Sequence, residues 1–185
     1  MALTISGTGN GSLNNLSLSA STGDILDSAN TTFFGVDQWY LNTSHTGNTD
    51  ITAWTRLTGD QGGSIGSAMS VSSGIWTFPS TGIWKVYGYF DLNFTAADSD
   101  FGNVQIKTTN DNFSTTHTNL WYANNFVEDE GWRNGVSVSM IFDCTDTSND
   151  KLKFTLDSAN TGNFLEGINT NIYRTFVNFT RLGDT

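Results

Sequence analysis

Three aspartates in one short segment are the residues of this sequence best suited to hold a metal ion. Asp143, Asp146 and Asp150 supply carboxylate oxygens, which are the ligands that Ca²⁺ prefers. Their spacing does not match the calcium-binding loop that joins two helices. Acidic side chains are also common in solvated turns, so we predict no metal site and keep these three aspartates as the candidate ligands.

A second segment matches the nucleophile turn of serine hydrolases. The pattern Gly-x-Ser-x-Gly is present as Gly62-Gly63-Ser64-Ile65-Gly66, but that turn leads from a strand into a helix and requires a histidine and an acid. No helical pattern follows, and the only histidines, His45 and His117, lie in polar stretches rich in threonine. We predict a flexible loop here and no catalytic residue, and therefore expect that the protein is not an enzyme.

Neither the single cysteine nor the glycines near the start of the chain indicate cofactor chemistry. Cys144 has no second cysteine to pair with, and the apolar residues before it predict a buried, inert thiol. Gly7-x-Gly9-x-Gly11 lacks the preceding strand and following helix of a dinucleotide-binding loop. We predict no cofactor. A carboxylate pair that hydrolyses polysaccharide stays open, because the distance between the two groups in space decides it.

Three aromatic residues beside a polar loop are the candidate receptor contacts. Trp121 and Tyr122 precede the segment 124–131, and Trp132 follows it. Exposed aromatic rings stack on the faces of sugars or pack in protein interfaces. We favour packing, and the alternative is a carbohydrate-binding module that recognises a host surface glycan.

The composition indicates that a β-rich domain positions these residues. Of the 185 residues 14% are charged and 13% are aromatic, and polar turn-forming residues are abundant. This balance favours short strands over amphipathic helices. The net charge of −10 disfavours a nucleic-acid partner. No apolar segment approaches the roughly 20 residues that a membrane helix needs, so we expect no membrane insertion.

From Phe33 onward the hydrophobic pattern predicts nine strands in one domain, residues 33–185. We place the strands near residues 33–41, 51–57, 74–78, 82–94, 101–108, 118–127, 134–142, 151–157 and 170–182. The segment Asp143–Asp150 lies between two alternating runs and predicts a hairpin. Many short antiparallel strands favour a sandwich, a jelly roll or a barrel.

The long strand after the only proline has two unlike faces. Pro79 cannot donate a hydrogen bond to a sheet and predicts a break at a sheet edge. One face of the following strand predicts core and presents Trp84, Val86, Phe90, Leu92 and Phe94. The other face presents Tyr87 and Tyr89, which a solvated surface does not need. We predict that these tyrosines, with Phe176 of the last strand, contact a partner.

Residues 1–32 differ from the rest of the chain because they contain no aromatic residue. They have too few bulky side chains to build a core, so alone they are expected to be extended or mobile. Their spaced aliphatic residues suit the addition of a strand to another protein. We predict an anchoring arm that acts through Leu3, Ile5, Leu13, Leu16 and Leu18, and a mobile tail is the alternative.

One segment resembles a signature of the jelly-roll domains of the tumour-necrosis-factor and complement type: Phe78-Pro79-Ser80-Thr81-Gly82-Ile83-Trp84-Lys85-Val86. The resemblance implies an all-β, two-sheet antiparallel jelly roll that forms trimers. In such trimers a tyrosine after the signature points toward the threefold axis, and the matching position here is Tyr87. The sequence departs from the family at Trp84, where tyrosine or phenylalanine is commoner, and in having no collagen-like stalk.

Over residues 36–185 the sequence is also similar to structural and fibre proteins of tailed phages, especially marine ones. The similarity rests on segments such as Gln38-Trp39-Tyr40-Leu41, Trp54-Thr55-Arg56-Leu57 and the ending Thr180-Arg181-Leu182-Gly183-Asp184-Thr185. It implies a non-enzymatic fibre or decoration protein, made in the host cytoplasm and placed on the outside of the virion. We therefore expect a homotrimeric jelly-roll knob that residues 1–32 dock on another virion protein.

Overall fold

The computed structural model describes residues 35–185 except for 60–61, 96–99, 116–118, 128–130, 161 and 171. The predicted anchoring arm, residues 1–32, lies outside the described residues. All the regular elements of the described part are β-strands. None of these residues belongs to a helix long and apolar enough to cross a membrane. The described part of the chain is therefore all-β, as the composition predicts.

Thirteen strands follow one another along the described part of the chain. They are β1 (Val36–Leu41), β2 (His45–Thr46), β3 (Trp54–Arg56), β4 (Ser64–Ile65), β5 (Ser70–Ser72), β6 (Ile75–Thr77), β7 (Gly82–Asn93), β8 (Asp100–Thr109), β9 (Asn119–Val127), β10 (Arg133–Cys144), β11 (Lys151–Ser158), β12 (Phe164–Leu165) and β13 (Phe176–Gly183). Each of the nine predicted segments overlaps one strand. The strands that the pattern missed are β2, β4, β5 and β12, which are too short to display a period.

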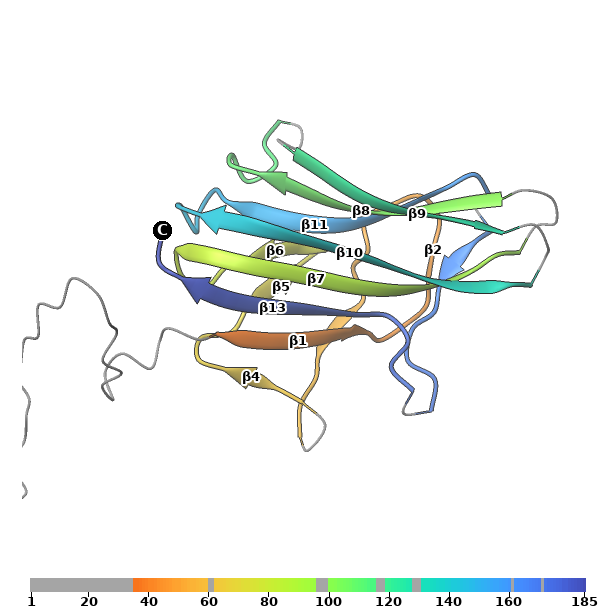
Figure 1. Ribbon diagram of the computed structural model, residues 1–185, viewed down its shortest axis with the longest axis horizontal. Coiled ribbons are helices and arrows are strands. Elements are labelled where there is room, and N and C mark those ends of the chain that lie inside the picture. The colour runs from red at the N-terminus through yellow and green to blue at the C-terminus, as the bar shows by residue number, and fades with distance from the viewer. Residues whose placement is uncertain are drawn as a thin grey trace, which may run out of the picture.

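The strands form two antiparallel sheets that pack face to face (Figure 1). In sheet A, β13 lies between β1 and β7, while β10 pairs along the other edge of β7. Sheet B has the order β5-β6-β11-β8-β9. The chain changes sheet between β7 and β8, between β9 and β10, and again between β10 and β11. These repeated crossings between two antiparallel sheets are those of a jelly roll.

The inward faces of the two sheets share one aromatic core. Trp76 is fully buried, and its ring centroid lies 5.0 Å from that of Trp39 and 4.7 Å from that of Phe179. The predicted core positions of β7 are all buried: Trp84, Val86, Phe90, Leu92 and Phe94. The period of two along β7 therefore identified the core face of this strand correctly.

The turn before β7 confirms the break predicted at Pro79. β6 ends at Thr77 and β7 begins at Gly82. Gly82 has a φ of 135°, and a Cβ atom there would lie 2.5 Å from the carbonyl oxygen of Gly183. Only glycine permits this approach of β7 to the end of β13.

The predicted hairpin at Asp143–Asp150 is wrong. β10 pairs with β7 in sheet A, whereas β11 pairs with β6 and β8 in sheet B, so this segment carries the chain from one sheet to the other. Alternation marks a strand but does not identify its partner. The last strand also begins later than predicted, at Phe176, because Asn169 and Ile172 exchange backbone hydrogen bonds across a turn before it.

Candidate functional site

The outer face of sheet A presents three rows of side chains that cross β10, β7, β13 and β1. The rows are Ser137, Tyr89, Phe176 and Tyr40; Ser139, Tyr87, Asn178 and Gln38; and Ile141, Lys85, Thr180 and Val36. Successive residues of a strand point to opposite faces, so all twelve side chains point away from the core. We call this surface the A face.

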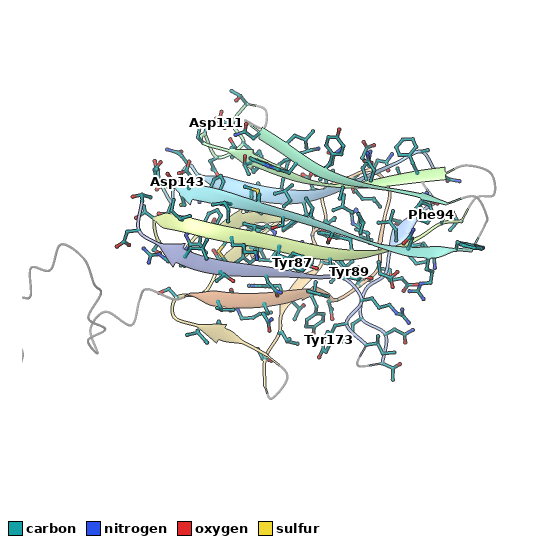
Figure 2. All side chains as sticks on the ribbon, viewed as in Figure 1. Tyr87, Tyr89, Phe94, Asp111, Asp143 and Tyr173 are labelled. Atoms are coloured by element: carbon teal, nitrogen blue, oxygen red, sulfur yellow. The ribbon has the colours of Figure 1, made fainter. Side chains whose placement is uncertain are left out.

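Aromatic rings gather on the A face (Figure 2). Phe176 stacks on Tyr89 with 5.6 Å between ring centroids and lies 6.3 Å from Tyr87. On the neighbouring strand, Tyr40 meets Tyr173 edge to face at 4.8 Å. All five rings are half-buried in the single chain. The structure thus brings together the three residues that the sequence predicted for a subunit interface, and it adds Tyr40 and Tyr173 to them.

The A face is uneven because small side chains and hollows lie beside the rings. A Cβ atom at Gly135 of β10 would lie 2.0 Å from the hydroxyl oxygen of Tyr89, so the tyrosine lies across this glycine. A hollow of about 310 Å³ opens between Lys85 and Tyr87 of β7 and the facing residues of β13. A second hollow, of about 210 Å³, is lined in part by Tyr40. Such relief suits interlocking with another protein surface.

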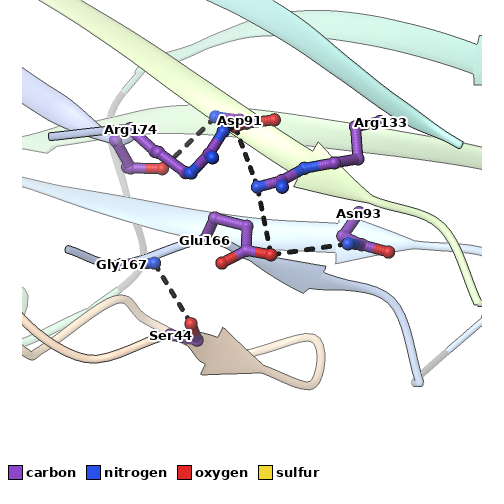
Figure 3. Close-up of polar contacts among 8 residues, drawn as sticks. Ser44, Asp91, Asn93, Arg133, Glu166, Gly167 and Arg174 are labelled. Atoms are coloured by element: carbon purple, nitrogen blue, oxygen red, sulfur yellow. Dashed lines mark hydrogen bonds and ion pairs between the residues drawn. The ribbon is translucent and has the colours of Figure 1, made fainter. Parts of the chain in front are cut away.

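Charged residues form a network at one border of the A face (Figure 3). Asp91 follows Tyr89 by two residues on the same side of β7. The Arg133 guanidinium lies 3.2 Å from Asp91 Oδ2 and 3.0 Å from Glu166 Oε1, and Arg174 lies 3.2 Å from the same Asp91 oxygen. Two carboxylates therefore face two guanidinium groups, and the network is electrically balanced.

The outer face of sheet B, which we call the B face, is polar. Its rows are Leu120, Lys107 and Lys153; Tyr122, Gln105 and Thr155; and Asn124, Asn103 and Asp157. Gln105 Nε2 donates a hydrogen bond of 3.1 Å to Asp157 Oδ2, and Lys153 forms an ion pair of 2.8 Å with Asp50. These bonds are made on the surface itself, whereas Asn103 Oδ1 is buried without a hydrogen-bond partner among the described residues, so the B face satisfies most but not all of its polar groups.

The three predicted receptor contacts do not form one site. Trp121 is half-buried and packs against the core, because it points to the opposite side of β9 from Tyr122. Tyr122 is 61% exposed on the B face, and Trp132 is 60% exposed. From Tyr122 the strand β9 runs on to Val127, roughly 16 Å further. Trp132 follows this end of β9 in the sequence, and its carbonyl accepts a hydrogen bond from the backbone N–H of Phe94. Tyr122 and Trp132 are therefore two separate exposed rings.

The aspartates considered as metal ligands stabilise a turn. Asp150 Oδ2 accepts hydrogen bonds from the backbone N–H groups of Thr145 at 2.7 Å and Asp146 at 2.8 Å. The Ser148 N–H donates to Asp146 and lowers the pKa of that carboxyl. Asp143 points outward from β10 and is exposed. Within the described residues, no three histidine, cysteine, aspartate or glutamate side chains gather where they could hold a metal ion.

The residues considered for nucleophilic chemistry lie apart. Cys144 is buried at the end of β10, and this burial raises the pKa of its thiol to about 12. Burial also lowers the pKa of His45, while His117 lies outside the described residues. Ser64 belongs to the short exposed strand β4, which pairs with β1, so the predicted loop is wrong at this residue. In the described part of the chain no strand-to-helix turn supports a hydrolase nucleophile.

An ion pair between the buried Asp37 and the partly exposed Arg56, beneath the edge of the A face, was not predicted. Asp37 is 1% exposed and accepts hydrogen bonds from Arg56 Nε at 3.0 Å, Trp39 Nε1 at 2.8 Å and the Met69 backbone N–H at 2.8 Å. The Arg56 guanidinium also lies 4.4 Å from the centroid of the Trp39 ring. Asp37 occupies an inward position in the alternation of β1, and a carboxylate in such a position is a signal that sequence inspection could have used.

Comparison with known proteins finds matches in structure but not in sequence families. No protein-family model and no curated protein matches this sequence. Among solved structures, Eiger TNF from S. frugiperda is similar with a TM-score of 0.59 and 12% identity, over 82% of this chain and 94% of that one. Murine APRIL at pH 8.5 is similar with a TM-score of 0.53 and 13% identity, over 80% and 99% of the two chains. These likenesses show the fold: the described chain is a two-sheet antiparallel jelly roll of the tumour-necrosis-factor type.

Proposed function

We propose that this protein is a non-enzymatic structural protein that assembles as a homotrimer through the A face. The observation that carries the proposal is the cluster of Tyr87, Tyr89 and Phe176, which stays half-buried on the outside of a folded sheet. Aromatic residues are enriched in protein interfaces, and charged residues are depleted at their centres. The A face follows this distribution, because its charged network lies at the border beyond Tyr89.

The trimer in particular is supported by the resemblance of residues 78–86 to tumour-necrosis-factor-like domains. That resemblance assigns Tyr87 to the threefold axis, and Tyr87 lies in the middle row of the A face. Ser139 and Asn178 flank it in this row, and they leave space around the ring for side chains of other subunits.

The place of this trimer, on our proposal, is the exterior of a tailed-phage virion, on the head or the tail. Residues 1–32 dock the protein on another virion protein, and residues 33–185 project as an adhesive knob. This part of the proposal is supported by the sequence similarity over residues 36–185 and by the lack of aromatic residues in the arm. It requires no cofactor and no nucleic acid.

The oligomeric state tests the use of the A face. Light scattering coupled to size-exclusion chromatography should give the full chain a mass of three times 20.2 kDa. Tyr87→Asp should give a folded monomer, because it places an unpaired charge in the interface. Tyr122→Asp makes the same change on the B face and should leave the trimer intact. A monomeric native chain, or a Tyr87→Asp trimer as stable as the native one, would contradict the proposal.

Virion incorporation tests the role of the arm. Deletion of residues 2–30 should abolish incorporation into particles while the purified knob remains folded by circular dichroism. Replacing Leu13, Leu16 and Leu18 with serine should have the same effect without shortening the chain. Normal incorporation of either variant would show that the arm does not dock the protein.

A second candidate function is recognition of a host glycan through the B face. It is favoured by the exposed ring of Tyr122, which lies opposite Gln105 beside the hydrogen bond to Asp157. A ring of this kind stacks on a sugar face, and the amide and carboxylate bond its hydroxyl groups. Binding to a glycan array that Tyr122→Ala removes and Trp132→Ala preserves would support this function at Tyr122.

A further inference from the structure

The charged side chains of the A face divide into a paired set and an unpaired set. Asp91, Arg133, Glu166 and Arg174 neutralise one another in the border network. Two further charges point outward on this side of sheet A: Lys85 of the third row, on β7, and Asp143 on β10, two residues beyond Ile141 of that row. Within the described residues neither side chain makes an ion pair or a side-chain hydrogen bond. One cation and one anion are therefore left on this surface.

Lys85 stands at a hollow that offers it no counter-ion. The hollow of about 310 Å³ is lined by Lys85, Tyr87, Asn178 and Thr180, which supply hydroxyl and amide groups but no carboxylate. Lys85 lies in the third row, between Ile141 and Thr180, and is exposed in the single chain. If the A face is covered by a second copy, the ammonium group loses water and requires an acidic partner.

Asp143 lies near the end of β10 (Figure 2), next to the row of Lys85 in the register of β10 against β7. It follows Ile141, the neighbour of Lys85, by two residues on the same side of β10. In the described part of the chain β10 pairs with β7 alone, so its second edge is free. In a ring of identical subunits, each contact brings together two different patches of the chain. The free β10 edge of one copy against the Lys85 hollow of the next copy is a contact of this kind.

We infer that, in the trimer proposed above, Lys85 of one copy forms an ion pair with Asp143 of the next copy around the ring. The inference rests on the proposed function, because it needs the A face to be covered by a second copy. Charge complementarity identifies the pair, since these are the two charges that the face leaves unmatched. Each subunit contributes its hollow to one neighbour and its β10 edge to the other.

Two charge reversals on the full chain test the pair. Lys85→Glu and Asp143→Lys should each weaken association by about 30-fold or more, because each places like charges together in a buried contact. Lys107→Glu reverses a lysine of the B face and serves as the matched control, which should not change association. Masses are measured by light scattering over a dilution series, and folding is checked by circular dichroism.

Mixing the two variants separates contact between chains from contact within one chain. In a mixed trimer two of the three contacts join opposite charges: the new glutamate of Lys85→Glu meets the new lysine of Asp143→Lys, and the native Lys85 meets the native Asp143. The third contact, between two copies of the same variant, joins like charges. The mixture should therefore associate more strongly than either variant alone but more weakly than the native chain. Native mass spectrometry should find both chains in each trimer. A mixture that stays as dissociated as its components, or single variants that remain trimeric, would overturn the ion pair while leaving the A-face trimer standing. A monomeric native chain would overturn both.

Discussion

The A face and the B face cover the two sides of one core but differ in how they meet solvent. On the A face Tyr89 stacks on Phe176, and the unpaired Lys85 borders a hollow. On the B face Gln105 bonds to Asp157 and Lys153 pairs with Asp50, although Asn103 Oδ1 stays without a partner in the described part of the chain. The inward residues of both sheets are mainly apolar. The two faces therefore differ in their outward residues, and the cluster of aromatic rings lies on the A face.

The largest loss of stability is expected from a substitution in the core that lies between the two sheets. Trp76→Ala removes a fully buried ring that packs on Trp39 and Phe179 and should lower the free energy of unfolding by about 3–5 kcal/mol. Tyr122→Ala removes an aromatic ring of the B face and should change this free energy by less than about 0.5 kcal/mol. Urea denaturation monitored by fluorescence measures both. Similar losses in the two variants would contradict the assignment of the core.

A smaller loss of stability is expected when the buried Asp37 carboxylate beneath the A face is removed. Asp37→Ala leaves the Trp39 and Met69 N–H groups and the Arg56 guanidinium without their acceptor and should cost about 1–3 kcal/mol. Asp157→Ala removes a carboxylate of the B face, where water can replace it. Its cost should stay within about 0.5 kcal/mol. Equal urea midpoints for the two variants would remove the distinction between the buried and the surface carboxylate.

Substitutions at two glycines should affect different properties: one lowers the stability of the fold, and the other weakens the trimer. At Gly102, on the inward side of sheet B, a Cβ atom would lie 2.0 Å from Leu92 Cδ2, so Gly102→Ala should lower the free energy of unfolding by about 1–3 kcal/mol. At Gly135 the added Cβ displaces Tyr89 on the A face. Gly135→Ala should therefore weaken the trimer and leave the stability of the monomer almost unchanged. Urea denaturation and light scattering measure the two effects, and a reversed pattern would contradict the assigned faces.

The smallest effect is expected at the loop after β8. Hydrogen bonds from Thr109 and Thr115 lower the pKa of Asp111 to about 2 from its ordinary 3.8. A carboxyl with a lowered pKa stabilises the fold above its ordinary pKa, and this stabilisation is lost as the pH falls toward the lowered value. Asp111→Asn should therefore make the urea midpoint less dependent on pH in this range. An unchanged slope would show that these bonds do not stabilise the fold.

The sequence predicted single strands better than their partners. Alternation along β7 assigned Trp84 to the core and Tyr87 to the opposite face, because burial follows the period of two. The same alternation in β10 and β11 suggested a hairpin, although the strands belong to different sheets. Two strands alternate in the same way whether they pair with each other or face each other across a core.

The candidate site was predicted in part for the same reason. Tyr87, Tyr89 and Phe176 were predicted from alternation, but their neighbour Tyr40 depends on the register of β1 against β13, which pattern alone does not give. The pairing of Trp121 with Tyr122 as exposed contacts ignored a rule that the sequence does carry. Consecutive residues of a strand point to opposite faces, so only one of the two could be exposed.

The position of β13 has a consequence for how the protein is made. β13 occupies the centre of sheet A, between β1 and β7, yet it is the last of the described strands to leave the ribosome. Until residues 176–183 emerge, the edges of β1 and β7 that it will join lack their partner, and open edges invite pairing with other chains. Sheet A can therefore close only after synthesis of β13, and nascent chains shorter than this are the species most prone to aggregate during translation.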